Sequence, residues 1–358
     1  MEPGNKNKKT VHLVMVGACY LDTILTVPHF PDEDAKLRAT ALQVRRGGNC
    51  PNTLEVLQQL LSATTPNNQQ QQEHQPIIKP HLVTCLPHRQ ASATHKILES
   101  FGAATVVDFG HCLFRDGCDE AASSYILRSK ATGSRTIVNY NELPEMTADE
   151  FDETASRLIA EHGGDDSEFW WHFEGRIPKT TLHCIRYVRR LFLPGTTVSV
   201  EVEKPDREGL DDLAAESDVV FYSRSWAEYC VRFRRRQSAV KRLSLIQLPP
   251  LAESGIYRAR DLSKDRVGFI KSFTHCPANP SGGDISVVDT IGAGDTFIAG
   301  MLYGLICHTH DWSLEAKLAF AVSLSTAKVQ REGFAGLAAA VLETEQEEQQ
   351  QQPPSPPR

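Results

Sequence analysis

The chain has 358 residues, a net charge of -7 and 41% hydrophobic residues, so it can form one large α/β domain or two smaller ones. It contains neither a long basic run nor an apolar stretch of membrane-spanning length, which argues against nucleic-acid and membrane partners. The arginine cluster at positions 232–236 fits a solvated helix face better than a nucleic-acid surface.

The nine cysteines are scattered, and none forms the C-x-x-C pair of a zinc site or a redox motif. Cys112 and Cys118 are the nearest two, and this usage favours free thiols in a reducing compartment. The polar N-terminal residues do not resemble the apolar core of a signal peptide. These features together predict a cytoplasmic protein.

Strand and helix patterns alternate between two polar ends, residues 1–9 and 343–358, whose composition predicts disorder. The near-continuous apolar run Val11–Gly17 predicts a strand that is buried on both faces. Further strands are predicted near Leu82–Thr84 and at Phe169–Glu174, Thr197–Glu203, Asp218–Tyr222, Leu243–Leu248 and Ser286–Asp289. Helices are predicted around Leu54–Leu61, His95–Phe101, Thr180–Phe192 and Leu314–Val329. This alternation predicts an α/β fold with a doubly wound, mostly parallel sheet.

Two segments interrupt the alternation with consecutive extended patterns, Thr23–Val44 and Ser123–Asn141. Together they can form a small antiparallel sheet that projects from the edge of the main one. Ligands bind beyond the carboxyl ends of parallel strands, so a projecting sheet there would act as a lid. The glutamine-rich stretch 64–76 is expected to be a surface loop rather than a domain boundary.

A glycine turn between a short strand and an amphipathic helix lies at residues 287–297. Gly292 and Gly294 allow the backbone to approach a ligand closely, and a helix N-terminus suits a phosphate or a developing anion. Asp295 lies in the first helical turn, where a carboxylate can take a proton from an attacking hydroxyl. The alternative role of Asp295 is to cap an ordinary helix.

A second glycine pair, Gly47-Gly48, precedes a predicted helix that begins near Asn49. Asn49 and Asn52 lie three residues apart, so one helix face can offer both amides to a polyol. Asparagine also serves as a simple helix N-cap. Asp22 follows the first strand and can either accept two sugar hydroxyls or cap a turn.

These motifs, in this order, resemble the ribokinase-like, or PfkB, family of carbohydrate kinases over roughly residues 10–338. The signatures are G-G-N at 47–49 and D-T-I-G-A-G-D at 289–295. Within that family the sequence is most similar to the ketohexokinase subgroup, through R-G-G-N at 46–49, S-R-T-I-V at 134–138, H-F-E-G-R at 172–176 and V-E-V-E-K-P at 200–205. The resemblance implies a three-layer α/β/α kinase domain over residues 10–342, with a projecting lid from segments of about 18–46 and 112–141.

The resemblance also implies an activity: transfer of the ATP γ-phosphate to a ketose hydroxyl, converting fructose to fructose 1-phosphate. Asp295 would be the catalytic base, and Gly292, Ala293 and Gly294 would form the anion hole. The implied sugar contacts are Asp22, Gly48, Asn49, Asn52 and Asp295. The implied nucleotide contacts are Arg135 from the lid, the Gly292–Gly294 turn, and Ala252, Glu253, Ser254 and Gly255.

Mg²⁺ on the nucleotide and K⁺ as an activator are the implied ions. Glu174, Glu201 and Glu203 are acidic candidates near the magnesium, through water; at least one of them also suits a plain solvent-facing strand position. The resemblance further implies a homodimer that pairs through the lid sheets.

Two departures from the family pattern leave other functions open. The nucleotide turn at 252–255 follows Pro249-Pro250 and has no tryptophan, and residues 223–226 replace the family's N-x-x-E element. One alternative is a kinase of the same family for another sugar or a nucleoside. Another is a catalytically weak relative that binds a sugar or a nucleotide.

Overall fold

The computed structural model describes residues 8–63, 75–191, 196–205, 207–223, 225–226, 256–259 and 286–342. Several predictions fall outside these residues: the two disordered ends, most of the glutamine-rich loop, the arginine cluster, the strand Leu243–Leu248 and the nucleotide turn at 252–255.

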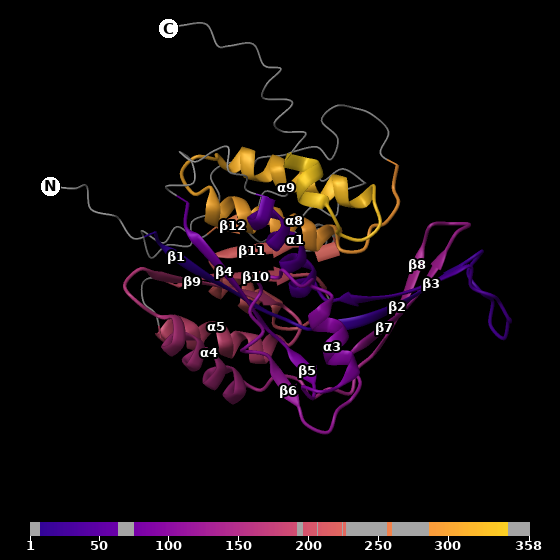
Figure 1. The fold of residues 1–358 in the computed structure, drawn as a ribbon, viewed down its shortest axis with the longest axis horizontal. Helices are drawn as coiled ribbons and strands as arrows, with labels where there is room; N and C mark the ends of the chain where they lie inside the picture. The colour runs from indigo at the N-terminus through magenta and orange to yellow at the C-terminus, as the bar shows by residue number, and fades with distance from the viewer. Residues whose placement is uncertain are drawn as a thin grey trace, which may run out of the picture.

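A six-stranded, mostly parallel sheet forms the centre of the molecule (Figure 1). Its order is β12-β11-β10-β9-β1-β4, and β12 alone among these strands runs antiparallel to its neighbour. The strands are β1 (Thr10–Val16), β4 (Ile77–Val83), β9 (Ser167–Glu174), β10 (Thr196–Val202), β11 (Val219–Tyr222) and β12 (Ile256–Ala259). The doubly wound sheet predicted from the sequence is confirmed.

Helices cover both faces of this sheet because its strands are apolar on both sides. In β1, Leu13 and Met15 pack in one core, whereas Val14 and Val16 pack in the other. The first core is covered by α1 (Asn49–Ala63), α3 (Ser92–Glu99), α8 (Ala293–Cys307) and α9 (Leu314–Val329). The second is covered by α4 (Ala148–His162), α5 (Pro178–Leu191) and α6 (Leu210–Glu216).

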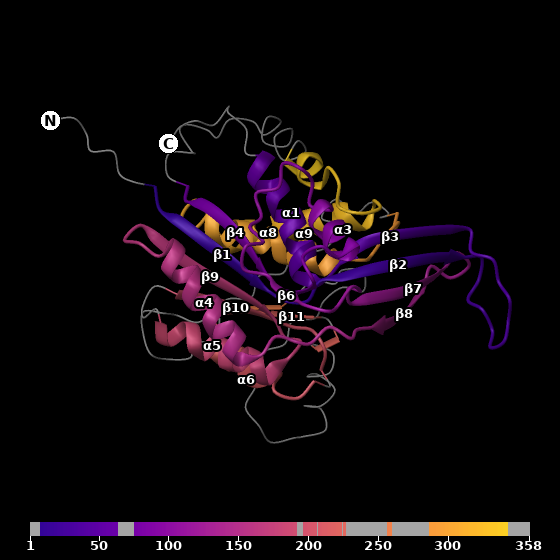
Figure 2. The same ribbon diagram turned by 60° about the horizontal axis from the view of Figure 1, so that its bottom comes forward.

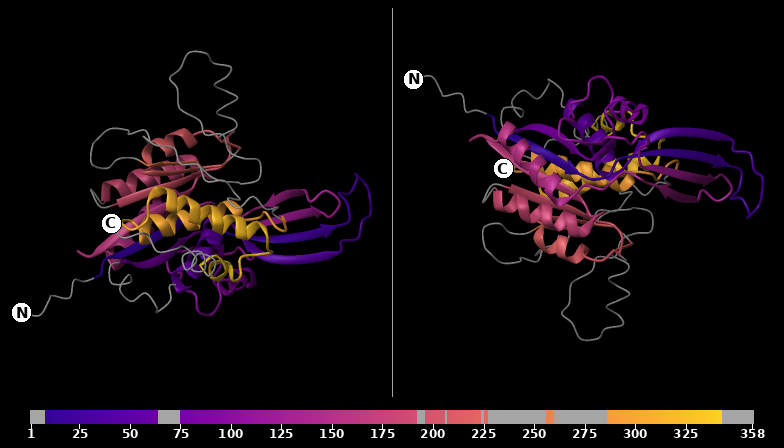
Figure 3. Two further views of the ribbon diagram at one scale, coloured as in Figure 1. Left: turned by 90° about the horizontal axis from the view of Figure 1, so that it is seen from above. Right: turned by 90° about the horizontal axis from the view of Figure 1, so that it is seen from below.

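A separate four-stranded sheet projects from the edge of this body, as Figures 2 and 3 show. Its order is β3-β2-β7-β8, from β2 (Tyr20–Val27), β3 (Ala41–Gly47), β7 (Ser123–Ser129) and β8 (Arg135–Tyr140). The prediction that this sheet is antiparallel is wrong in one respect, because β2 and β7 pair in parallel. Residues 20 and 123 both enter the lid from the body, which gives their strands the same direction.

A two-stranded sheet pairs β5 (Cys85–Pro87), which follows the body strand β4, with β6 (Leu113–Arg115), which precedes the lid strand β7. Within the second predicted lid segment, the first strand of the four-stranded sheet is β7, which begins at Ser123. The structure also contains α4 and α6, which the sequence reasoning did not identify. The start of α4 is a capping box of Thr147 and Glu150, which is visible in the sequence as T-x-x-E.

The predicted strand Ser286–Asp289 is wrong: these residues have irregular backbone. The N–H groups of Val288 and Asp289 both donate to the Val329 carbonyl oxygen at the end of α9, at 2.7 and 3.1 Å. Val287 and Val288 remain largely exposed, so their β-branched side chains find no core to enter. Tertiary contacts here override local propensity.

The seven cysteines within the described residues are all free thiols, and Cys112 and Cys118 are among them. Among the described residues, every helix is too short or too polar to cross a membrane.

Candidate active site

A cavity of about 690 Å³ lies between the lid and the body. It is lined by residues from both sheets and by the N-terminal turns of α1 and α8. The predicted site residues that line it are Asp22, Gly48, Asn49, Asn52, Arg135, Gly292, Gly294 and Asp295. Ala293, which was predicted to belong to the anion hole, is buried behind this surface at the start of α8. The residues of the predicted nucleotide turn lie outside the described part of the chain.

The N-terminus of α8 opens into the cavity through the glycine turn. Gly292 has a φ of 80°, and a Cβ added there would lie 2.3 Å from Phe334 Cζ. By contrast, no described atom lies within 4 Å of the corresponding position at Gly294, so a ligand can reach that backbone. The first N–H groups of a helix find no carbonyl oxygen within the helix, and the dipole adds positive potential. The turn is therefore suited to an anion such as a phosphoryl group.

Asp295 is held at this N-terminus by two contacts with α1. The Asn52 amide nitrogen Nδ2 donates to Asp295 Oδ2 at 2.7 Å, and Thr53 Oγ1 donates to the Asp295 carbonyl oxygen at 3.2 Å. Because these contacts join positions 243 and 242 residues apart, the two glycine motifs meet in one site. The Asp295 carboxylate is buried to 7% exposure but lines the cavity.

Arg46 fixes the direction of the Asn52 amide. Its Nη1 donates to Asn52 Oδ1 at 3.0 Å, which leaves Nδ2 facing Asp295. Arg46 is itself held by an ion pair with Glu55, by a 3.0 Å hydrogen bond to Ser100 Oγ and by stacking over Phe101. Arg46 belongs to the R-G-G-N motif at 46–49, but the motif alone indicates no role for its side chain.

Close backbone approach explains the other glycine pair. Gly48 has a φ of 107°, and a Cβ there would lie 2.2 Å from the Ala18 carbonyl oxygen. A Cβ at Gly47 would lie 2.3 Å from the Asp22 carboxylate. Because Gly47 has no side chain, the Asp22 carboxylate can lie against its backbone and still line the cavity. Burial raises the pKa of this carboxyl group.

Two glutamates stand side by side at the carboxyl ends of β9 and β10. Glu174 is the register partner of Glu201, and both line the cavity with Glu203. Glu174 accepts a 2.8 Å hydrogen bond from the Ala18 N–H, and Glu201 accepts one of the same length from the Asn49 amide. Burial raises the pKa of Glu174 to about 7. Burial, followed by the charge of Asp295, raises the pKa of Glu201 well above its usual range.

This carboxyl group set fits a hydrated Mg²⁺ ion. Carboxylate oxygens are the ligands that Mg²⁺ prefers, usually with several waters retained. Burial raises the pKa values of Glu174 and Glu201 because it disfavours their ionised forms. A divalent cation beside them would favour those ionised forms.

Cations also line this cavity. Arg135 lies on β8 of the lid and donates to Thr290 Oγ1, two residues before Gly292. Arg176, Lys204 and Arg207 reach the same cavity from the ends of the body strands. A cavity that combines cations with a helix N-terminus matches a polyphosphate ligand.

A buried ion pair holds Asp289, which lies three residues before Gly292 of the glycine turn. Lys328 is fully buried, and its Nζ donates to Asp289 Oδ2 at 3.0 Å and to the Asp289 carbonyl oxygen at 3.1 Å. Arg45 from the lid lies 3.2 Å from the same Oδ2. Burial alone would raise the pKa of Asp289, but Lys328, the Ile291 N–H and Arg45 outweigh it and lower that pKa.

Lys328 was not among the predicted site residues, although its position on an apolar helix face indicates a buried role. Lys328 follows Phe320 and Leu324 at helical spacing on the buried face of α9. A lysine on an apolar stripe indicates a buried partner charge.

Comparisons with known proteins relate the chain to carbohydrate kinases. Residues 275–339 match the model of the pfkB family carbohydrate kinases. Mouse (Mus musculus) ketohexokinase is 27% identical over 332 residues, which cover 91% of this chain and 98% of that protein.

The fold of the chain is similar to that of several solved structures. The nucleoside kinase of Methanocaldococcus jannaschii, an archaeal member of the ribokinase family, superposes with a TM-score of 0.62 at 14% identity, covering 95% of this chain and 100% of that one. Arabidopsis thaliana ribokinase, complexed with ribose and ATP, gives 0.53 at 14% identity, covering 92% and 97% of the two chains. Residues 275–339 thus resemble the pfkB family carbohydrate kinases, most of the chain is similar in sequence to mouse ketohexokinase, and the fold is similar to that of these solved kinases.

Proposed function

We propose that this kinase transfers the γ-phosphate of ATP to a hydroxyl of a ketose, converting fructose to fructose 1-phosphate. The observation that carries the proposal is the Asp295 carboxylate, which Asn52 holds at the N-terminus of α8 inside the cavity. Similarity to mouse ketohexokinase supports the choice of a ketose. One kinase domain spanning residues 10–342 would carry the activity.

Separate groups would accept the proton of the attacking hydroxyl and stabilise the charge that develops on the phosphoryl group. Asp295 would accept the proton of the attacking hydroxyl, since it lies where a substrate in the cavity can reach it. The turn Gly292–Gly294 would stabilise charge on the phosphoryl oxygens, a task that needs positioned donors rather than covalent chemistry. Asp22, Gly48, Asn49 and Asn52 would hold the sugar hydroxyls.

ATP would enter against Arg135 and the turn at 252–255, with Mg²⁺ on its phosphates. The metal would neutralise phosphate charge and align the transfer. Glu174, Glu201 and Glu203 would hold it through water, because their oxygens line the same cavity. K⁺ is proposed as an activating ion, and replacing it with a large organic cation in the assay tests that role.

The outer face of the lid supports a homodimer. Thr23 pairs with Val44 and with Tyr125, which in turn pairs with Val138, so these side chains share one face. Leu42, Val44, Tyr125, Val138 and Tyr140 are between 48% and 64% exposed. An exposed apolar sheet face of this kind suits a second copy of the chain. Light scattering should give a dimer, and Val138→Glu should give a monomer.

Free thiols at the seven described cysteines support a reducing compartment, and we propose the cytoplasm. Small-molecule substrates, rather than nucleic acid or membrane, are the proposed partners. Expression with a fluorescent tag and cell fractionation test this placement.

Substrate choice is tested by measuring ADP release across a panel of acceptors. Purified full-length protein is assayed with fructose, tagatose, ribose, glucose and adenosine. Fructose-dependent turnover supports the proposal, whereas turnover on ribose or adenosine alone would replace the ketose with another acceptor of the same family. Absence of turnover on every acceptor, in a folded protein that binds ATP, would indicate a non-catalytic binding protein.

A further inference from the structure

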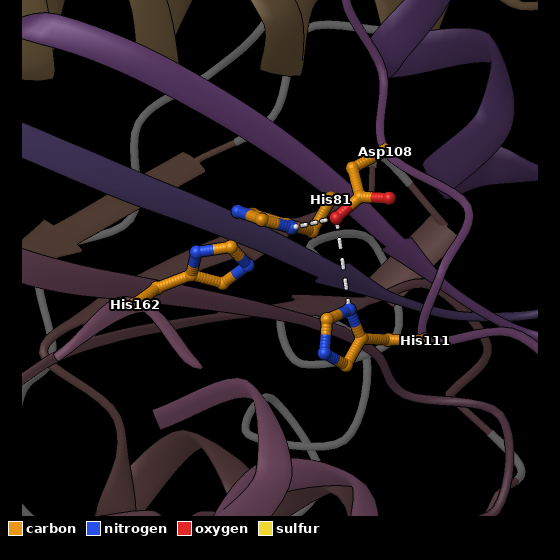
Figure 4. A group of neighbouring side chains, drawn as sticks. All are labelled: His81, Asp108, His111 and His162. Atoms are coloured by element: carbon orange, nitrogen blue, oxygen red, sulfur yellow. Dashed lines mark hydrogen bonds and ion pairs between the residues drawn. The ribbon is translucent and has the colours of Figure 1, made fainter. Parts of the chain in front are cut away.

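A second cluster of ionisable side chains lies on the α4 face of the central sheet, and none of its members lines the candidate active site. His81 comes from β4, Asp108 and His111 from the loop before β6, and His162 from the last turn of α4 (Figure 4). One ligand atom from each of the four residues lies within 4.8 Å of the other three.

Asp108 is the centre of this cluster. Its Oδ2 lies 3.0 Å from His81 Nδ1 and 3.7 Å from His111 Nδ1, as the dashed lines in Figure 4 indicate. A tetrahedral Zn²⁺ ion with bonds of about 2.1 Å places its ligand atoms about 3.4 Å apart. The two distances bracket that value, and the ligand atoms of all four residues lie within 4.8 Å of one another.

The outer contacts of the cluster orient its ligand atoms inward. His81 Nε2 lies 3.0 Å from His12 Nδ1, which leaves Nδ1 of His81 for the cluster. Glu161 Oε2 lies 3.4 Å from His111 Nε2, and the Gly110 N–H donates to Asp108 Oδ1 at 2.8 Å. Metal-binding histidines in proteins commonly have such a carboxylate or imidazole partner on the second nitrogen.

The cluster also leaves buried nitrogen atoms without hydrogen bonds. His111 is 2% exposed; Asp108 lies 3.7 Å from its Nδ1 and Glu161 3.4 Å from its Nε2, but neither nitrogen makes a well-formed hydrogen bond to a described residue. His162 Nε2 is likewise buried and has no hydrogen-bond partner among the described residues. A buried polar atom without a partner costs about 1–3 kcal/mol, so an additional group at this point would stabilise the fold.

We propose that His81, Asp108, His111 and His162 bind one transition-metal ion, and that Zn²⁺ is the ion best suited to this site. Three imidazoles and one carboxylate form a complete tetrahedral set for zinc. Four protein ligands leave no open position for a substrate, so the role is structural. The ion would fasten the end of α4 to β4 and to the loop 108–111.

Metal binding to the full-length protein tests the proposal directly. After treatment with a chelator, the protein is titrated with Zn²⁺ while its thermal midpoint is recorded, and with Co²⁺ while its visible spectrum is recorded. One ion per chain, a rise in midpoint and a tetrahedral Co²⁺ spectrum are expected. A wild-type chain that binds neither ion, or whose midpoint Zn²⁺ leaves unchanged, would overturn the proposal and leave a bound water as the partner of His111.

Variants assign the ion to this cluster. His111→Gln and Asp108→Asn should each abolish the Co²⁺ spectrum, and Glu161→Gln should weaken Zn²⁺ affinity roughly 10- to 100-fold. His183→Gln is the matched control, because His183 pairs with Asp152 at 2.9 Å outside the cluster. Loss of binding in the control, or its full retention in both ligand variants, would contradict the assignment.

Discussion

The amide nitrogen of Asn52 donates a 2.7 Å hydrogen bond to the carboxylate of Asp295. Arg46 holds the other end of that amide, so a buried chain of contacts runs from the Arg46–Glu55 ion pair to the proposed base. Because the contacts join the two glycine motifs, they bring the predicted sugar-binding and phosphate-binding ends of the site together.

Asn52→Ala should lower kcat about 100-fold, since an unanchored carboxylate loses its alignment with the substrate hydroxyl. Steady-state ADP release measures this effect. Gln58→Ala, on the same helix, is the control, because Gln58 bonds the Phe101 carbonyl oxygen away from the cavity. Equal rates for wild type and Asn52→Ala would mean that the contact does not position the base.

The two glycines of the turn should respond differently to alanine. Gly292→Ala forces a positive φ on alanine and places its Cβ against Phe334, so we expect a loss of about 1–3 kcal/mol in the free energy of unfolding. Gly294→Ala meets open space and should retain stability while impairing phosphate approach. Urea unfolding and ATP binding separate the two effects. Similar stability losses in both variants would contradict this interpretation.

Lys328→Met should destabilise the fold by about 3–5 kcal/mol, because it leaves the buried Asp289 carboxylate without its main partner. Lys317→Met is the matched control on the same helix, since the Lys317 ammonium donates to the Trp312 carbonyl oxygen rather than to a carboxylate. Chemical denaturation compares the two. If Lys328→Met lowers the free energy of unfolding by less than Lys317→Met does, the Lys328–Asp289 pair contributes little to stability.

Stability should fall below neutral pH in part through His172. Burial lowers the pKa of His172 from 6.5 to about 3, so below 6.5 the unfolded chain binds a proton that the folded chain does not. Its contribution is therefore complete above pH 6.5 and is lost as the pH falls towards 3. From about pH 7 to about pH 5, wild type should lose about 2 kcal/mol more than His172→Gln. Parallel pH profiles of the two proteins would contradict the assignment.

Much of the fold follows from local pattern. The run Val11–Gly17 predicted β1 because alternate side chains enter the two cores, and Leu314–Val329 predicted α9 to the residue. The pattern failed at Ser286–Asp289, where β-branched residues meet the end of α9 instead of a neighbouring strand. The pattern also failed to predict α4, because acidic residues separate the apolar residues of that helix.

Candidate site residues could be proposed one by one from the sequence, but the contacts between them could not. Motif spacing pointed to Asn52 and to Asp295 separately, whereas the hydrogen bond between them depends on how α1 packs on α8. Lys328 and Asp289 meet for the same reason. Of the proposed metal ligands only Asp108 and His111 are close in sequence, and His81 and His162 join them from two other segments.

The central claim is that Asp295 is the catalytic base of a ketose kinase. Its most direct test is fructose-dependent ADP release by wild type and Asp295→Asn, with ATP and fructose affinities measured on the same samples. We expect kcat to fall by about 10³-fold or more in Asp295→Asn, with both affinities within a few-fold of wild type. A variant that turns over at the wild-type rate, or that loses ligand binding in proportion to its activity, would contradict that claim.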